Sequence, residues 1–129
     1  MMSFDAVSAA TVAGVAVIGA LAVGRFLERR MLRTRDRAWQ EEHPVGPDGI
    51  VPGAGSIALQ GEGERAVLLL HGFGDTPQSL SRLAEALHAE GWTVRAPLLP
   101  GHGRTLGAFG QAGADDWESA ARGAYETLV

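Results

Sequence analysis

The residues of this chain that could take part in chemistry are concentrated in two glycine-rich segments of its second half. One segment is His71-Gly72-Phe73-Gly74, and in the other His102 lies between Gly101 and Gly103. A histidine can act as a general acid or base near neutral pH, and a glycine lets the backbone come close to a ligand. These two segments are therefore the first candidates for a functional site.

The carboxylates and serines form no catalytic group that the spacing alone reveals. Asp115 and Asp116 are adjacent, but Asp115 with Glu118 also fits a capping box at the start of a helix, which we favour. The absence of cysteine excludes a thiolate metal site and a cysteine nucleophile, and the lone His43 suggests a solvated loop residue. No metal or cofactor is predicted. None of the serines has the flanking pattern G-x-S-x-G of a nucleophile on a strand-to-helix turn: Ser3, Ser8, Ser56, Ser79, Ser81 and Ser119.

The elements that must position the two segments follow an α/β order. The apolar run 66–70 predicts a strand buried on both faces, and 92–96 predicts another. Between them, Thr76 as N-cap and Pro77 start a helix that Gly91 would end. A short strand at 57–59, a loop at 97–113 and a helix from Asp115 complete the pattern. Strand, helix, strand and helix in this order predict the α/β class.

In this order and spacing, the motifs resemble the N-terminal third of an α/β-hydrolase domain. The resemblance rests on the strand ending at Leu70, on His71-Gly72-Phe73-Gly74, on Pro100-Gly101-His102-Gly103 and on Asp115-Asp116-Trp117. The motifs are most similar to those of the bacterial carboxylesterase and monoacylglycerol-lipase branch, and the resemblance covers about residues 56–129. The resemblance implies a serine ester hydrolase that acts through an acyl-enzyme on a small ester or an acylglycerol, without metal or cofactor. A thioesterase or peptidase on the same fold stays open, because fold does not decide substrate.

The resemblance also implies roles for individual residues. Acyl transfer builds negative charge on a carbonyl oxygen, which backbone N–H groups can stabilise, and the matching donor here is the N–H of Phe73. Gly72 and Gly74 would let the backbone approach the substrate. His71 and His102 are implied to support their loops, His102 by bracing Gly101 and Gly103, and not to act as bases. A further expectation concerns three residues that would line an acyl pocket or only cover it: Leu106, Ala108 and Phe109.

The family's nucleophile, acid, general base and second oxyanion donor have no counterpart in residues 1–129. We therefore expect an incomplete α/β-hydrolase domain, the front part of a membrane-anchored serine ester hydrolase. The alternative is a non-catalytic membrane-tethered module or a degenerate hydrolase remnant.

The membrane expectation comes from residues 1–37, which differ sharply from the rest. Their net charge is +3, against −7 for residues 38–129, and residues 6–24 contain no charged side chain. Nineteen helical residues reach about 29 Å, close to the hydrocarbon thickness of a bilayer. We expect a single transmembrane helix at about 6–27, with the Arg-rich flank and everything after it in the cytoplasm. A cleaved signal peptide and a buried helix are the alternatives.

The overall composition excludes several classes of protein, and the distribution of Pro and Gly indicates the domain boundaries. A total of 46% hydrophobic residues with 20% charged excludes a wholly disordered chain and a polytopic membrane protein. The net charge of −4 gives no indication of nucleic-acid binding. Seven of the twelve residues 44–55 are Pro or Gly, so we assign 38–55 to a linker and 56–129 to the hydrolase-like domain. Trp39, at the start of the linker, is expected near the lipid headgroups.

Overall fold

The structure is a computed structural model that describes the backbone of residues 4–128 and the side chains of residues 12–128. It divides into two compact units, Met1–Arg35 and Asp36–Val129. Helix α1, Phe4–Glu42, forms the first unit and ends within the second. The described side chains of the first unit, from 12 to 35, are all exposed.

The expected membrane span starts among residues 6–11, whose side chains lie outside the described part of the chain. Among the residues that the structure does describe, no helix is long and apolar enough to cross a membrane. The exposed side chains of α1 do include large apolar ones, such as Ile18 at 68% and Phe26 at 63%. The transmembrane helix stays a prediction.

The second unit is built on a three-stranded mixed sheet. Strands β1 (Ile57–Leu59), β2 (Ala66–Leu68) and β3 (Thr93–Ala96) lie in the order β1-β3-β2. Strand β1 is antiparallel to β3, and β2 is parallel to it. The central strand is the most buried, with Val94 and Ala96 fully enclosed. The parallel pair requires a crossover connection, which the helical segment between β2 and β3 supplies.

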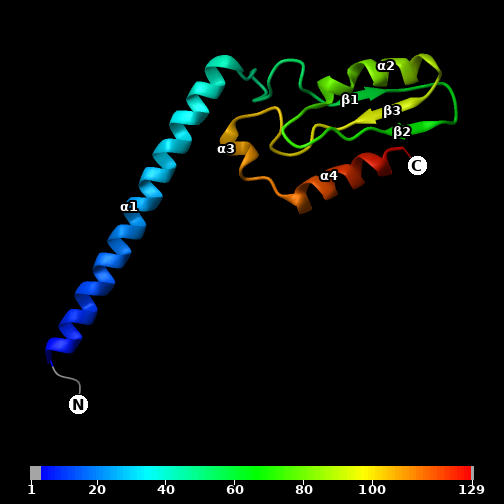
Figure 1. The fold of residues 1–129 in the computed structure, drawn as a ribbon. Helices are drawn as coiled ribbons and strands as arrows, with labels where there is room; N and C mark the ends of the chain where they lie inside the picture. The colour runs from blue at the N-terminus through cyan, green and yellow to red at the C-terminus, as the bar shows by residue number, and fades with distance from the viewer. Residues whose placement is uncertain (1–3, 129) are drawn as a thin grey trace. The chain divides into compact units, whose positions relative to one another are not determined.

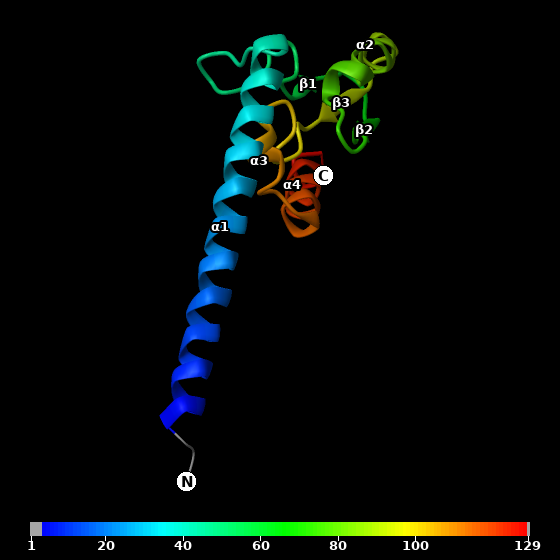
Figure 2. The same cartoon turned by 60° about the vertical axis from the view of Figure 1, so that its left-hand side comes forward.

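Helices lie on both sides of this sheet, as the α/β class requires (Figure 1). The crossover consists of the 3₁₀ turn η1 (Pro77–Leu80) and helix α2 (Ser81–Ala89). After β3 come the short helix α3 (Leu106–Phe109) and helix α4 (Ala114–Glu126). Turned by 60°, the unit again shows α2 and α4 on opposite sides of the strands (Figure 2).

The helix expected after Thr76 starts differently from the prediction. Thr76 occupies the N-cap position and Pro77 follows it, but the Thr76 side chain makes no capping hydrogen bond. The Asp75 carboxylate contacts this start instead, because its Oδ1 accepts the Thr76 N–H and its Oδ2 accepts the Ser79 hydroxyl, both at 2.7 Å. The end of the helix is as predicted, since Gly91 has φ +84° and its N–H donates to the His88 carbonyl. Such a positive φ favours glycine because it has no Cβ.

The burial expected for the strand at 66–70 is wrong. Strand β2 is not buried on both faces: Val67 and Leu68 are half-buried and Leu70 is 50% exposed. The reason is that β2 lies at an edge of the sheet, and no described strand pairs with its outer side.

The last helix has only half of a capping box, at another position than expected, because its N-cap residue Gly113 has no side chain. Helix α4 begins at Ala114, and the carboxylate of Asp116 accepts the Gly113 N–H at 2.9 Å. Glu118 instead pairs with Arg122 at 2.7 Å, one helical turn further on. The expected box at Asp115 and Glu118 fails because the helix starts earlier, at Gly113 in extended conformation. Asp116 lies three residues after Gly113, at the position from which a carboxylate can accept the N–H of the N-cap residue.

The Pro- and Gly-rich segment lies against the second glycine-rich loop. The Val51 N–H donates to the Gly103 carbonyl at 2.8 Å, and Ala54 is 1% exposed. The Leu98 N–H donates to Ser56 Oγ at 2.8 Å. These contacts place residues 51–56 within the packed unit.

Candidate functional site

Both ring nitrogens of His71 are engaged, Nδ1 within its own segment and Nε2 with the loop that contains the second segment. Its Nε2 lies 3.1 Å from the Leu99 N–H, and its Nδ1 lies 3.1 Å from the Gly72 carbonyl oxygen. An N–H can only donate and a carbonyl can only accept, so Nε2 is the acceptor and Nδ1 carries the proton. Burial lowers the pKa of His71, which favours this neutral form. With both nitrogens engaged, the ring has none free for proton transfer to a ligand.

His102 is still more buried, at 3% exposure, and is surrounded by rings. Its Nδ1 lies 3.2 Å from the Pro100 carbonyl oxygen, so Nδ1 is the donor and Nε2 an acceptor. Within the described part of the chain, that buried Nε2 has no hydrogen-bond partner. The ring is nearly perpendicular to that of Phe109, at 4.8 Å between centroids, and lies 4.8 Å from the ring of His71.

Trp117 connects helix α4 to this loop. Its indole N–H donates to the Pro100 carbonyl oxygen at 2.9 Å, the same oxygen that His102 contacts. Its ring centroid lies 5.5 Å from that of His102 and 6.0 Å from that of Phe73. Trp117 belongs to the Asp-Asp-Trp part of the resemblance, which indicated no hydrogen-bond partner for it. The missing information was the partner, because the Pro100 carbonyl can be identified only once the chain is folded.

We call the five rings that meet here the aromatic cluster: His71, Phe73, His102, Phe109 and Trp117. It gathers side chains from the loop after β2, the loop after β3, and helices α3 and α4. Edge-to-face packing of this kind contributes about 0.5–1.5 kcal/mol per pair beyond burial. The cluster therefore fixes the two glycine-rich segments relative to each other.

Phe73 combines an exposed ring with an unused backbone donor. Its side chain is 78% exposed, although its ring contacts Phe109 at 5.0 Å. Among the hydrogen bonds found for residues 4–128, none has the Phe73 N–H as its donor. Gly74 follows with φ +73°, a conformation that a side chain would disfavour. With no acceptor among residues 4–128, this N–H is available as a donor on a loop that His71 fixes, and the oxyanion role of Phe73 stays a prediction.

Gly101 is required by close packing. Its φ is +80°, and a Cβ there would lie 2.9 Å from the Ala108 carbonyl oxygen and 2.9 Å from the Cα of Phe109. A Cβ at Gly72, in contrast, would meet nothing within 4 Å. The two loops therefore use glycine differently: Gly101 lets α3 approach, whereas the backbone at Gly72 faces open space.

Asp75 serves the start of the crossover helix. Its two carboxylate oxygens accept from the Ser79 hydroxyl and the Thr76 N–H, both at 2.7 Å. These hydrogen bonds, chiefly the one from Ser79, lower the pKa of Asp75. The carboxylate is thus charged near neutral pH and supports η1.

A cavity of about 370 Å³ borders both segments. Gly74, Gly101, His102 and Gly103 contribute to its wall, and so do Leu106 and Phe109, whereas Ala108 does not. Trp39 and His43 also line it, with their rings stacked at 4.8 Å and 18°. The sequence offered no signal for this contribution. Apart from His43, four residues after Trp39, the other residues of the lining follow Trp39 by at least twelve residues. In the described part of the chain, no group of three or more His, Asp or Glu residues is arranged to hold a metal ion.

Comparison with known proteins finds lipases and esterases. No profile of a known protein family matches the chain. Over 66 residues, 51% of this chain, it is 40% identical to a thermostable monoacylglycerol lipase of Bacillus sp. (strain H-257). Over the same number of residues it is 36% identical to a carboxylesterase of Bacillus subtilis (strain 168). The matches cover 26% and 27% of those proteins, so the chain spans about a quarter of the length of these relatives.

Part of the chain is also similar in structure to a solved lipolytic enzyme. The structure comes from work on LipS and LipT, two metagenome-derived lipolytic enzymes, and it matches with a TM-score of 0.59 and 37% identity. The match covers 61% of this chain and 32% of the other. Together, the matches support an esterase- or lipase-like hydrolase segment with a mixed α/β fold.

Proposed function

We propose that this chain provides the oxyanion-binding segment and the supporting loops of a serine ester hydrolase. The observation that supports this best is the Phe73 N–H, which has no acceptor among residues 4–128 and lies on a loop held by His71. The similarity to a monoacylglycerol lipase and a carboxylesterase supports the same reaction class. The substrate is a small carboxylic ester or an acylglycerol.

In the proposed reaction, a serine hydroxyl attacks the ester carbonyl carbon and passes its proton to a general base. The carbonyl oxygen becomes negatively charged, and the Phe73 N–H donates a hydrogen bond to it. The alcohol then leaves with a proton, and water releases the acid from the acyl-enzyme. The contribution of this chain is to hold that donor in place before the charge forms, which saves reorganisation in the transition state.

We propose that the serine, the acid, the general base and the second donor are supplied outside residues 1–129. The open edge of β2 supports this, because its apolar residues are only half-buried and Leu70 is 50% exposed. An exposed apolar edge strand favours pairing with another strand. In the family that the chain resembles, the strand before the nucleophile follows the helix corresponding to α4, and it would fit this edge.

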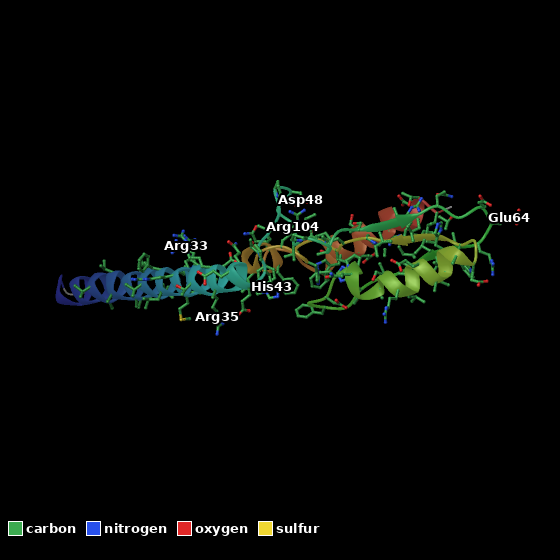
Figure 3. All side chains as sticks on the ribbon, turned by 90° about the horizontal axis from the view of Figure 1, so that it is seen from above. Arg33, Arg35, His43, Asp48, Glu64 and Arg104 are labelled. Atoms are coloured by element: carbon green, nitrogen blue, oxygen red, sulfur yellow. The ribbon has the colours of Figure 1, made fainter. Side chains whose placement is uncertain are left out.

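We also propose that residues 6–27 anchor the protein in a membrane, with the second unit in the cytoplasm. The support is the uncharged run 6–24 and the exposure of apolar side chains on α1, such as Val15 and Leu21. Arg33 and Arg35 point to opposite sides of the helix, so the basic flank surrounds it (Figure 3). Basic residues on one flank of a span favour the cytoplasmic side.

The test of the proposed reaction starts from the coding region beyond Val129 and the intact mass of the native product. A continuation into G-x-S-x-G, with hydrolysis of a chromogenic short-chain ester by the longer chain, would support the proposal. Truncation of that chain at Val129 should then abolish turnover. Activity of residues 1–129 well above the uncatalysed rate would show that the triad assignment is wrong. A genuine stop after Val129, with a matching mass, would favour the non-catalytic module.

A further inference from the structure

The cavity beside the glycine-rich segments has a wall that the proposed reaction does not use. This wall comes from the end of α1 and the segment after it, through Trp39, Val51 and Ala54. All of these residues belong to the unit Asp36–Val129, so the cavity lies within one compact unit. Its volume of about 370 Å³ is within the range of small-molecule sites.

The end of α1 is held against the opposite wall by a specific hydrogen bond. The Asp36 carboxylate accepts the Leu106 N–H at 2.7 Å, at the first residue of α3. One helical turn after Asp36, the Trp39 ring stacks on His43, whose Nδ1 lies 3.3 Å from the Trp39 carbonyl oxygen. Trp39 is therefore a fixed wall and not a freely rotating side chain.

Several polar side chains of the lining already have partners within the chain. Asp75 accepts from Thr76 and Ser79, as described above. Arg104 lies beside the turn that contains Asp48 (Figure 3), and its Nη1 is 3.5 Å from the carbonyl oxygens of Asp48 and Gly49. What remains for a ligand is largely carbon surface, contributed by the following residues: Trp39, Val51, Ala54, Leu106 and Phe109.

The charges of the lining decide which end of a ligand would enter. The Asp75 carboxylate and the lone pair of the His102 Nε2 both disfavour a negatively charged group. Arg104, the arginine of the lining, would favour one, but its Nη1 already lies 3.5 Å from two carbonyl oxygens. A neutral aliphatic chain therefore suits the cavity better than a free carboxylate.

We infer that this cavity binds the aliphatic chain of a neutral ester, and that Trp39 is a specificity-determining residue that limits the length of the chain. The inference rests on the proposed function and assigns the end of α1 to the substrate site. A helix that leads out of the other unit would thus contribute directly to substrate selection.

Binding can be measured without turnover, on residues 1–129 with ¹⁵N-labelled tryptophan. Methyl octanoate is titrated, and the three indole N–H signals are followed, with Trp39→Phe assigning the signal of Trp39. We expect a saturable shift of that signal, and weaker shifts with methyl butyrate and with octanoate anion. Trp92 is the internal reference, because its ring lies against the Arg65 guanidinium at 4.8 Å and does not line the cavity. An unmoved Trp39 signal, or equal shifts of Trp39 and Trp92, would overturn the inference, and so would octanoate binding as tightly as its methyl ester.

A second measurement uses a longer chain that hydrolyses esters. Trp39→Ala should raise the ratio of kcat/KM for dodecanoate over butyrate esters on the order of tenfold, mainly through KM. Trp92→Ala, the matched control, should leave the ratio unchanged. Normal hydrolysis with an unchanged ratio in Trp39→Ala would refute the inference and leave the proposed function standing. If no ester is hydrolysed but methyl octanoate shifts Trp39, the binding site stands and the proposed function fails.

Discussion

At the level of single residues, the candidate site depends on a histidine that has to remain neutral. Protonation of His71 at Nε2 would place a second donor against the Leu99 N–H, and the hydrogen bond between the two loops would be lost. His71 and His102 thus have structural roles in place of the acid–base chemistry that their residue type suggests. In each residue the Nδ1–H donates to a backbone carbonyl of its loop, and in His71 the Nε2 also accepts the Leu99 N–H.

The first prediction concerns pH. Because burial lowers the pKa of His71 in the folded protein, the unfolded chain binds a proton more readily. The contribution of His71 is therefore fully present above its usual value of 6.5, and is lost as the pH falls from there through the lowered folded value. Urea unfolding at a series of pH values should show a declining free energy below 6.5. In His71→Leu this part of the decline should vanish, whereas His43→Gln, at an exposed site, should keep it. An identical pH dependence in His71→Leu would contradict the argument.

The second prediction concerns the backbone of Phe73. In an ester-hydrolysing longer chain, Phe73→Pro removes the N–H and should lower kcat on the order of 10²–10³-fold. Phe73→Leu keeps the N–H and is the control, so its kcat should fall far less. Steady-state kinetics with a chromogenic ester gives both values, and circular dichroism checks the fold. A near-normal kcat in Phe73→Pro would mean that this residue only forms part of a wall.

At the level of elements, the loop after β3 is positioned by contacts from the two helices that follow it, α3 and α4. Helix α3 approaches the backbone of Gly101, and α4 reaches the Pro100 carbonyl through Trp117. Neither contact is local in sequence. Changes at these contacts should therefore affect stability even though they alter no candidate catalytic group.

The third prediction compares two glycines of the candidate site. Gly101→Ala forces a Cβ within 2.9 Å of backbone atoms of α3 and should reduce the free energy of unfolding by about 1–3 kcal/mol. Gly72→Ala meets nothing within 4 Å and should change stability much less. Urea unfolding of the two variants tests this directly. Equal effects would show that α3 does not pack on Gly101 in solution.

The fourth prediction isolates one hydrogen bond of α4. Trp117→Phe keeps an aromatic ring but removes the indole donor to Pro100, with an expected cost of about 1 kcal/mol. Trp92→Phe is the control, because no side-chain hydrogen bond of Trp92 is found within the described residues. Hydrogen exchange should also show faster opening of α4 in Trp117→Phe. Unchanged exchange would mean that the bond is not formed in solution.

At the level of the whole molecule, the proposed anchor makes the fifth prediction. Ile18→Arg places a charge near the middle of the proposed span, at a cost of about 2.5–3.5 kcal/mol for insertion. The membrane-bound fraction after cell fractionation should fall. Leu32→Arg lies beyond the span and should leave that fraction unchanged. Equal membrane association of the wild type and both variants would argue against residues 6–27 as a span.

Orientation can be tested in the same cells. A reporter that is active only in the cytoplasm should be active when fused after Val129. The reason is that six arginines follow the uncharged run, and basic residues favour the cytoplasmic side. A reporter that is active only outside the cytoplasm would reverse the proposed orientation.

Local patterns predicted the element types with fair accuracy. The strand at 57–59 has the expected bounds, and the strand expected at 92–96 is found at Thr93–Ala96. The crossover helix ends at Ala89, and Gly91, the predicted terminator, follows with a positive φ. These features depend on neighbours in sequence, on apolar runs and on residues with special φ values. The half box at Asp116 shows the limit, since two overlapping carboxylate patterns were available and backbone geometry selected one.

The amino-acid sequence alone was enough to indicate an α/β class, two glycine-rich segments as the candidate site, and a resemblance to ester hydrolases. It could not reveal the His71 to Leu99 bond, the Trp117 to Pro100 bond or the contribution of Trp39 to the cavity. Each of these joins residues from different elements, at a distance that only the packing of helices and strands establishes. Residue types and short spacings are properties of the chain, whereas partners remote in sequence are chosen by burial and by the need to satisfy polar groups away from water.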